Sequence, residues 1–152
     1  MVHALEEISR LLKQDGWLID IHPIRKAPLI KIHRGSDLLF IESDPGYDYD
    51  EGLRHADDAL EDAIRRGLFL VEGKNEFELV TYASSAAEMR EYWAKYGAFD
   101  GTPKDESIVA HQNDVYAKAG EIMRSNEGAE ITYHERARIT RLRLLNGNEP
   151  IL

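Results

Sequence analysis

The segment from Leu5 to Pro23 most constrains the fold of this chain, because the period of its apolar residues changes within it. Helical spacing comes first and predicts an amphipathic helix over residues 3–14. Asp15-Gly16 ends that helix, and we expect Gly16 to adopt the positive φ of a C-terminal cap. Trp17 to Ile21 then forms an apolar strand that Pro23 terminates. This segment therefore predicts a mixed α and β fold.

The chain has 152 residues, of which 43% are hydrophobic and none is cysteine. This length predicts a single domain over residues 1–145 with a substantial core, followed by a loose tail at residues 146–152. The lack of cysteine excludes disulfides, thiolate catalysis and Cys-ligated metal sites, and it fits a reducing compartment. No apolar run approaches the roughly 18 residues of a membrane span, and the N-terminus does not resemble a signal peptide, so we expect a cytoplasmic protein.

The formal net charge of -9 argues against a general affinity for nucleic acids or anionic membranes, since both present phosphates that attract basic surfaces. The charge is unevenly distributed. Ten carboxylates lie between Asp37 and Asp62 against the single Arg54, whereas the C-terminal part of the chain is rich in arginine. Such asymmetry can attract one copy to another, although solvated faces account for most charge runs.

Two short apolar runs, Pro28 to Ile32 and Leu38 to Ile41, flank Gly35 and predict a β-hairpin. A second helix is expected between Asp50 as its cap and Gly67 as its end. The stretch from Leu68 to Tyr82 is strand-like but contains Gly73-Lys74-Asn75. We interpret these three residues as a bulge in one long strand, with a hairpin turn as the alternative.

A capping box at Ser85 to Glu88 precedes a third helix, and Thr102-Pro103 is expected to start a long fourth helix that Gly128 ends. Residues 130–144 alternate as one long strand whose facing changes partway. The sequence thus predicts an α+β fold with four helices and about five strands in one sheet.

Class I S-adenosylmethionine-dependent methyltransferases carry the pattern E-x-x-R-x-L-K-P-G-G between their fourth and fifth strands. The opening segment resembles this pattern at Glu7, Arg10, Leu12, Lys13 and Gly16, with Gln14 and Asp15 where the family favours Pro and Gly. Gly67 to Tyr82 is similar to the sixth strand and Ile131 to Leu144 to the antiparallel seventh strand. The resemblance implies a partial Rossmann-like methyltransferase sheet, made of the fifth, sixth and seventh strand equivalents, with an added β-hairpin.

In that family the cofactor lies in the first half of the fold, on a Gly-rich loop after the first strand. This chain contains neither G-x-G-x-G nor G-x-G-x-x-G. The resemblance therefore implies a C-terminal half that lacks the cofactor-binding half. We expect it to bind no cofactor alone, and S-adenosylmethionine only if a partner supplies the other half.

The strand Trp17 to Ile21 would be an interior strand in the parent sheet. At an edge, it would expose apolar side chains and unpaired backbone groups. We expect a second copy, in a symmetric homodimer, or a partner chain to cover this strand. The predicted hairpin at residues 29–41 is a third candidate for covering it.

Asp20, His22 and Arg25 cluster at the end of the first strand and are candidate ligand contacts, with His22 able to act as a base near neutral pH. The alternative is a strand end that meets solvent, which is favoured because no nucleophile is evident. Tyr47 and Tyr49 are further candidates, since they are able to close over a pocket.

Four carboxylates at Asp44, Asp48, Asp50 and Glu51 are interpreted as a solvated acidic loop, because their spacing matches no EF-hand. The histidines show no metal-ligand spacing and are treated as surface or satisfied residues, so no metal site is predicted.

Three functions follow as hypotheses. The first is a methyltransferase-like domain that is non-catalytic alone, self-associates and has a binding or structural role. The second is the substrate-binding subunit of a split S-adenosylmethionine-dependent methyltransferase, completed by a partner chain. The third is an independent small enzyme or ligand-binding protein that uses His22 and Arg25.

Overall fold

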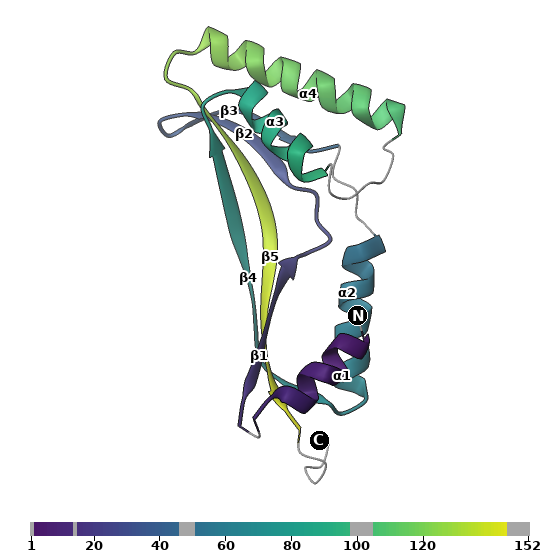
Figure 1. Cartoon of the computed structure of the whole chain (residues 1–152). Coiled ribbons are helices and arrows are strands. Elements are labelled where there is room, and N and C mark those ends of the chain that lie inside the picture. The colour runs from purple at the N-terminus through teal and green to yellow at the C-terminus, as the bar shows by residue number, and fades with distance from the viewer. Residues whose placement is uncertain (1, 14, 46–50, 98–104, 146–152) are drawn as a thin grey trace. The chain divides into compact units, whose positions relative to one another are not determined.

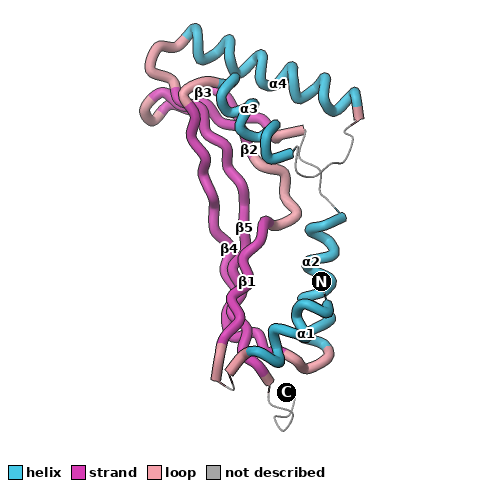
Figure 2. The backbone as a smooth tube through the Cα atoms, viewed as in Figure 1, coloured by secondary structure: helices cyan, strands magenta, loops and turns pink. Residues whose placement is uncertain are grey.

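The computed structural model describes residues 2–13, 15–45, 51–97 and 105–145. Within them, four helices and a five-stranded antiparallel sheet confirm the predicted α+β class (Figure 1). The chain divides into two compact units. Unit 1 comprises Met1–Arg25, Tyr49–Phe77 and Arg136–Leu152, and unit 2 comprises Lys26–Asp48 and Glu78–Glu135. The two longest strands contribute residues to both units. Figure 2 draws each of these strands, β4 and β5, in magenta.

Unit 1 contains α1 (Val2–Leu11), β1 (Trp17–Pro23) and α2 (Glu51–Arg65), together with one part each of β4 (Phe69–Ala83) and β5 (Glu130–Leu144). β1 and β4 both pair with β5. Apolar side chains from the two helices pack on the sheet and form the core of unit 1. Its buried members are Leu5, Ala59, Leu60, Ala63, Phe69 and Leu142.

The end of α1 differs from the prediction in two ways. The helix ends at Leu11, three residues early, and Gly16 is not among the described glycines with positive φ. A Cβ atom at position 16 would lie 3.0 Å from the carbonyl oxygen of Lys13. Glycine is therefore needed here for a close backbone approach, and not for a left-handed conformation.

β1 extends to Pro23, two residues beyond the predicted strand, and Pro23 lies opposite Ala137 of β5. The N–H of Ile24 donates to the carbonyl of Arg136 at 2.9 Å, so the backbone groups of Ile24 point toward β5. Because these groups alternate along a strand, those of Pro23 point away from β5. The missing N–H of proline therefore costs no hydrogen bond in the sheet.

Unit 2 contains β2 (Leu29–Arg34), β3 (Asp37–Ser43), α3 (Ala86–Gly97) and α4 (Glu106–Ser125). β2 and β3 form the predicted hairpin, and Gly35 has a φ of 60° in its turn. β2 also pairs with β5, where Ile30 lies opposite Tyr133. The core of unit 2 lies between these strands and the two helices. Its buried members are Ile30, Ile32, Phe40, Ala86, Met89, Val115, Tyr116, Ala119, Ile131 and Tyr133.

β4 is one continuous strand, so the hairpin alternative for Gly73 to Asn75 is wrong. Ion pairs within unit 1 indicate an irregularity at these residues. Arg136 contacts Glu76, whereas Arg141 and Arg143 both contact Glu72. In a regular antiparallel ladder, the residue numbers of every facing pair add to the same sum, so side chains that share a face keep the same odd or even relation along both strands. Here an even-numbered arginine contacts Glu76, whereas two odd-numbered arginines contact Glu72. One extra residue in β4, as in the predicted bulge, produces such an offset.

β5 spans the predicted residues, and the set of residues that it buries changes from odd-numbered to even-numbered along the strand, as predicted. Ile131 and Tyr133, which are odd-numbered, enter the core of unit 2. Leu142, which is even-numbered, enters the core of unit 1.

Of the two helices of unit 2, α3 begins with the predicted cap. Ser85 Oγ accepts a hydrogen bond from the N–H of Glu88 at 3.1 Å, as in a capping box, but the Glu88 carboxylate accepts from the N–H of Ser84. α4 has Asp105 as its N-cap, because the Asp105 carboxylate accepts from the N–H of Ser107 at 2.8 Å. The predicted start at Thr102-Pro103 lies outside the described residues. None of the described helices is both long and apolar enough to cross a membrane.

Candidate functional site

The structure brings together two of the predicted ligand contacts, Asp20 and His22, on the face of β1 that carries even-numbered residues. Nδ1 of His22 lies 2.8 Å from Oδ2 of Asp20, in a geometry that is not aligned as a hydrogen bond. Nε2 of His22 lies 3.1 Å from Oδ1 of Asp57 on α2. Arg138 of β5 donates to Nε2 of His22 at 2.8 Å and also binds the carboxylate of Asp57. The sequence analysis missed both Asp57 and Arg138.

Hydrogen bonding assigns the tautomer of His22. A guanidinium has no acceptor atom, so Nε2 of His22 accepts from Arg138, and Nδ1 of the neutral ring carries the proton toward Asp20. Burial raises the pKa of Asp57, but the hydrogen bond and the positive charge of Arg138 outweigh this effect and lower that pKa below its usual value. The one basic lone pair of His22 is thus already engaged. The cluster links β1 to α2 and β5, and it presents no free base.

The other three predicted contacts do not join this cluster. Arg25 is exposed, and no described hydrogen bond or ion pair connects it to His22. Tyr47 and Tyr49 lie outside the residues that the structure describes.

A second polar cluster lies in unit 2 around His134 of β5. Its Nε2 is 2.9 Å from Oγ1 of Thr132, and its Nδ1 is 3.2 Å from a carboxylate oxygen of Glu78. These distances resemble a nucleophile, base and carboxylate arrangement. Thr132 is buried, however, and lies opposite Lys31 within the strand ladder, so its neighbouring N–H groups are not positioned to stabilise an oxyanion. Lys31 Nζ also lies 3.3 Å from Nδ1 of His134. His134 is therefore a satisfied residue, as predicted.

A third cluster corrects the interpretation of Asp44 as part of a solvated loop. Asp44 is only 4% exposed. Its carboxylate accepts from Nε2 of Gln112 at 2.9 Å and from the hydroxyl of Tyr133 at 2.8 Å. Asp44 is therefore a buried acceptor that joins the end of the hairpin to α4 and β5. Asp48 and Asp50 lie outside the described residues.

Burial next to Asp44 changes the ionisation of its neighbours. Burial raises the pKa of Tyr133, and the negative charge and hydrogen bond of Asp44 raise it further. Burial and the charge of Asp44 also raise the pKa of Tyr116 and of the half-buried Glu135. Within the described part of the chain, the buried hydroxyl of Tyr116 has no hydrogen-bond partner. Trp93 packs on Tyr133 with 4.4 Å between ring centroids, so the cluster is enclosed by aromatic side chains.

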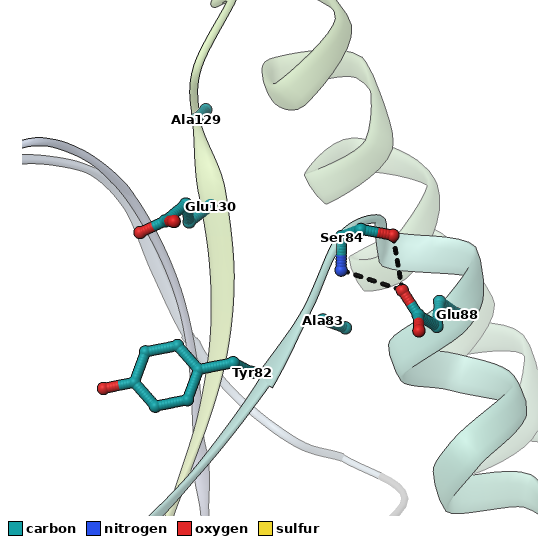
Figure 3. A pocket seen from close by; sticks show the side chains of 6 residues that line it. All are labelled: Tyr82, Ala83, Ser84, Glu88, Ala129 and Glu130. Atoms are coloured by element: carbon teal, nitrogen blue, oxygen red, sulfur yellow. Dashed lines mark hydrogen bonds between the residues drawn. The ribbon is translucent and has the colours of Figure 1, made fainter.

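One shallow pocket of about 310 Å³ opens where β4 meets α3. It is lined by Tyr82, Ala83, Ser84, Glu88, Ala129 and Glu130. Figure 3 shows the Glu88 carboxylate turned toward Ser84 and away from Glu130. The hydroxyl and the N–H of Ser84 both donate to the Glu88 carboxylate, so this pair serves the start of α3. The described residues also contain no group of three potential ligands that would hold a metal ion.

The face of β1 that carries odd-numbered residues exposes large apolar side chains. Trp17, Ile19 and Ile21 are 56%, 48% and 58% exposed, although all three are large and apolar. Among the described residues, β1 pairs with β5 alone, so its other edge has no strand beside it. Arg141 lies 5.1 Å from the ring centroid of Trp17 and covers part of it. The candidate functional site is therefore this surface.

The chain matches no known protein family, no curated protein and no solved structure.

Proposed function

We propose that this chain is a methyltransferase-like domain that is non-catalytic alone and self-associates through β1 to serve a binding or structural role. The observation that carries the proposal is the open edge of β1 with its three exposed apolar side chains. Exposed strand edges of this kind are usually short, charged or covered, because they template pairing with another chain.

The energetics favour a covered β1. Fully burying a large apolar side chain is worth about 1.5–3 kcal/mol, and Trp17, Ile19 and Ile21 each have about half of that gain left to make. A strand that pairs along the edge also satisfies backbone groups that are otherwise left to water. Both gains favour association, and they offset part of the translational and rotational freedom that two chains lose when they pair.

The topology of unit 1 supports the methyltransferase-like part of the proposal. The resemblance assigns Trp17 to Ile21 to the fifth strand of that family and Ile131 to Leu144 to its antiparallel seventh strand. Here β5 lies between β1 and β4, and β1 is antiparallel to it. In the family, the fifth strand is interior, and the uncovered edge of β1 is the edge that an interior strand would share with its neighbour.

The same uncovered edge favours one second candidate, a split methyltransferase in which a partner chain supplies the cofactor-binding half and occupies β1. The third hypothesis, an independent enzyme using His22 and Arg25, has less support. Its base is engaged by Arg138, and Arg25 does not join it.

Light scattering at micromolar concentrations tests self-association. We expect the purified chain to be a dimer and Ile19→Lys to be a monomer, because the substitution places a charge in the centre of the apolar face. Ile41→Lys is the matched control, since Ile41 is 49% exposed on β3 of unit 2 and should leave the dimer intact. A wild-type chain that stays monomeric throughout this range would contradict the proposal.

Calorimetric titration with S-adenosylmethionine tests the non-catalytic part. We expect no binding by the chain alone. Tight binding would overturn this part, whereas co-purification with a Gly-rich partner chain, and binding only by that complex, would support the split enzyme instead.

A further inference from the structure

We infer that two copies of this chain pair β1 with β1 in an antiparallel register centred on Ile19. The inference rests on the proposed self-association and specifies its geometry. It follows from the direction of the backbone groups of β1, from the position of Pro23 and from the side chains that each register would bring together.

The direction of the backbone groups comes from the hydrogen bond between Ile24 and Arg136. Trp17 lies opposite Arg143 and Pro23 opposite Ala137, and Ile24 continues the same register. The backbone groups of Ile24 point to β5, and alternation places those of the even-numbered residues there as well. The odd-numbered residues Trp17, Ile19 and Ile21 therefore present their N–H and C=O groups at the uncovered edge.

These same three residues also carry the exposed side chains. Centring a second β1 on Ile19 pairs Ile19 with its own copy, and Trp17 with Ile21 in both directions. Each pair exchanges two backbone hydrogen bonds, which gives about six in total. Every donor and acceptor that Trp17 to Ile21 presents at the edge is then used.

Registers centred closer to Pro23 are less favourable. A register centred on Asp20 would place the two Asp20 carboxylates directly opposite each other, which is unfavourable. It would also pair Trp17 with Pro23, which has no N–H to donate. A register centred on Ile21 would pair Ile19 with Pro23 and lose donors in the same way.

The Ile19-centred register brings compatible side chains together. On the exposed face, Trp17 meets Ile21 of the second copy, and aromatic and β-branched residues form favourable cross-strand pairs. On the opposite face, Asp20 meets Leu18, and the two Asp20 carboxylates are diagonal neighbours about 7–8 Å apart. Each of these carboxylates keeps its contact with Nδ1 of His22 at 2.8 Å.

The positive charges beside the apolar face do not oppose this pairing. Arg141 lies opposite Ile19 on β5, so three strand spacings separate it from Arg141 of the second copy. That distance is about 14 Å. It exceeds the Debye length of about 8 Å at physiological salt, so repulsion across the interface is screened. Arg141 also has a carboxylate of its own, since Glu72 lies 3.3 Å away.

Thiol cross-linking tests the register, and the chain is suited to it because it contains no cysteine. In this register the two copies of residue 19 have Cα atoms about 5.5 Å apart. The two copies of residue 21 are offset by four residues and lie about 14 Å apart. A bifunctional thiol reagent with a reach between these distances should therefore link Ile19→Cys to itself and leave Ile21→Cys unlinked. A mixture of Trp17→Cys and Ile21→Cys should form the cross-linked heterodimer.

The outcomes of this experiment test the register and the proposed self-association separately. Efficient self-linking of Ile19→Cys, together with linking in the mixture, supports the inference. A dimer by light scattering in which Ile19→Cys remains unlinked, or in which Ile21→Cys links to itself, overturns the register and leaves self-association standing. A monomeric wild-type chain overturns the proposed function itself. Circular dichroism of each reduced variant should match the wild type, since all three sites are half exposed.

Discussion

Asp57 ties the end of β1 to α2 through His22 and Arg138, and the fold stabilises its ionised form. A carboxyl group whose pKa is lowered by folding contributes stability above its unfolded pKa of about 3.9. That contribution is lost as the pH falls through the folded pKa. The cluster is therefore an acid-sensitive link between a strand and a helix of unit 1.

Asp57→Asn tests this link. We expect the substitution to lower the free energy of unfolding by about 1–2 kcal/mol at pH 7, because it leaves Arg138 without its charged acceptor. The difference from the wild type should shrink as the pH falls below about 4, because Asp57 has the higher pKa in the unfolded chain and protonation there favours unfolding. Denaturant titrations at both pH values measure it. Asp58→Asn, on the exposed side of the same helix, is the control and should change stability little at either pH.

We expect the two buried tyrosine hydroxyls of unit 2 to contribute differently to the stability of the fold. Tyr133→Phe removes a donor from the buried carboxylate of Asp44 and should cost about 2 kcal/mol of unfolding free energy. Tyr116→Phe removes a buried hydroxyl that has no described partner and should be neutral or slightly stabilising. Thermal unfolding of both variants measures the difference. Equal losses would show that the Tyr116 hydroxyl is bound by something beyond the described residues.

At the scale of single residues, the sequence predicted the contacts between residues that lie close together in the chain. Asp20 and His22 are two positions apart in a strand, which places them on one face. Their partner Asp57 is 35 residues from His22, and Arg138 is 116 residues away. Only the pairing of β1 with β5 brings Arg138 into reach. The spacing of Asp44 and the carboxylates that follow it matches no EF-hand and predicts a solvated loop, whereas the burial of Asp44 depends on α4 and β5.

At the scale of secondary-structure elements, glycines with similar surroundings differ in their backbone conformation. Gly35, in the β2–β3 turn, has a φ of 60°, and Gly73, in β4, does not have a positive φ. A Cβ atom at either position would meet nothing within 4 Å. Any difference between the two in tolerance of alanine therefore reports on conformation and not on packing.

Gly35→Ala should cost about 1–2 kcal/mol of unfolding free energy, because alanine is strained in the left-handed region. Gly73→Ala should instead be neutral or stabilise by up to about 1 kcal/mol, because it reduces the entropy of the unfolded chain. Chemical denaturation of the two variants makes the comparison. A similar loss at both positions would mean that Gly73 is also required by the irregularity in β4.

The elements themselves were largely predictable, and their ends less so. The alternating pattern of residues 130–144 determined β5, and the hairpin followed from apolar runs around Gly35. α4 begins at Glu106, later than predicted, with Asp105 as its N-cap. Cap choice depends on which side chain reaches an N–H group, and several residues near this helix start have suitable side chains.

At the scale of the whole molecule, two hydrophobic cores share two continuous strands. β5 supplies Ile131 and Tyr133 to the core of unit 2 and Leu142 to the core of unit 1. The order of strands in the sheet was beyond the sequence analysis, since pairing between distant segments leaves little local signal. The division into two cores was also not predicted. The cooperativity of unfolding shows whether the two units act as one domain.

The chain has two tryptophans, Trp17 in unit 1 and Trp93 in unit 2. Fluorescence of Trp93→Phe and Trp17→Phe variants thus reports on each unit separately. We expect coincident unfolding curves at one fixed protein concentration, because disrupting either core disrupts a shared strand. Met89→Ala, in the core of unit 2, should lower both midpoints through a loss of about 3 kcal/mol. Two separate midpoints, with only one shifted, would show that the units unfold independently.

Pro23 has a consequence for how far such molecules can assemble. An edge strand that offers a donor and an acceptor at every second residue can recruit one chain after another, which is how fibres grow. Pro23 ends the row of donors on β1, and the two-fold pairing that we propose would use the edge of both copies at once. On β4, the charged side chains of Glu72, Lys74 and Glu76 discourage a further strand. A proline that costs the sheet no hydrogen bond thus helps to keep the protein from polymerising.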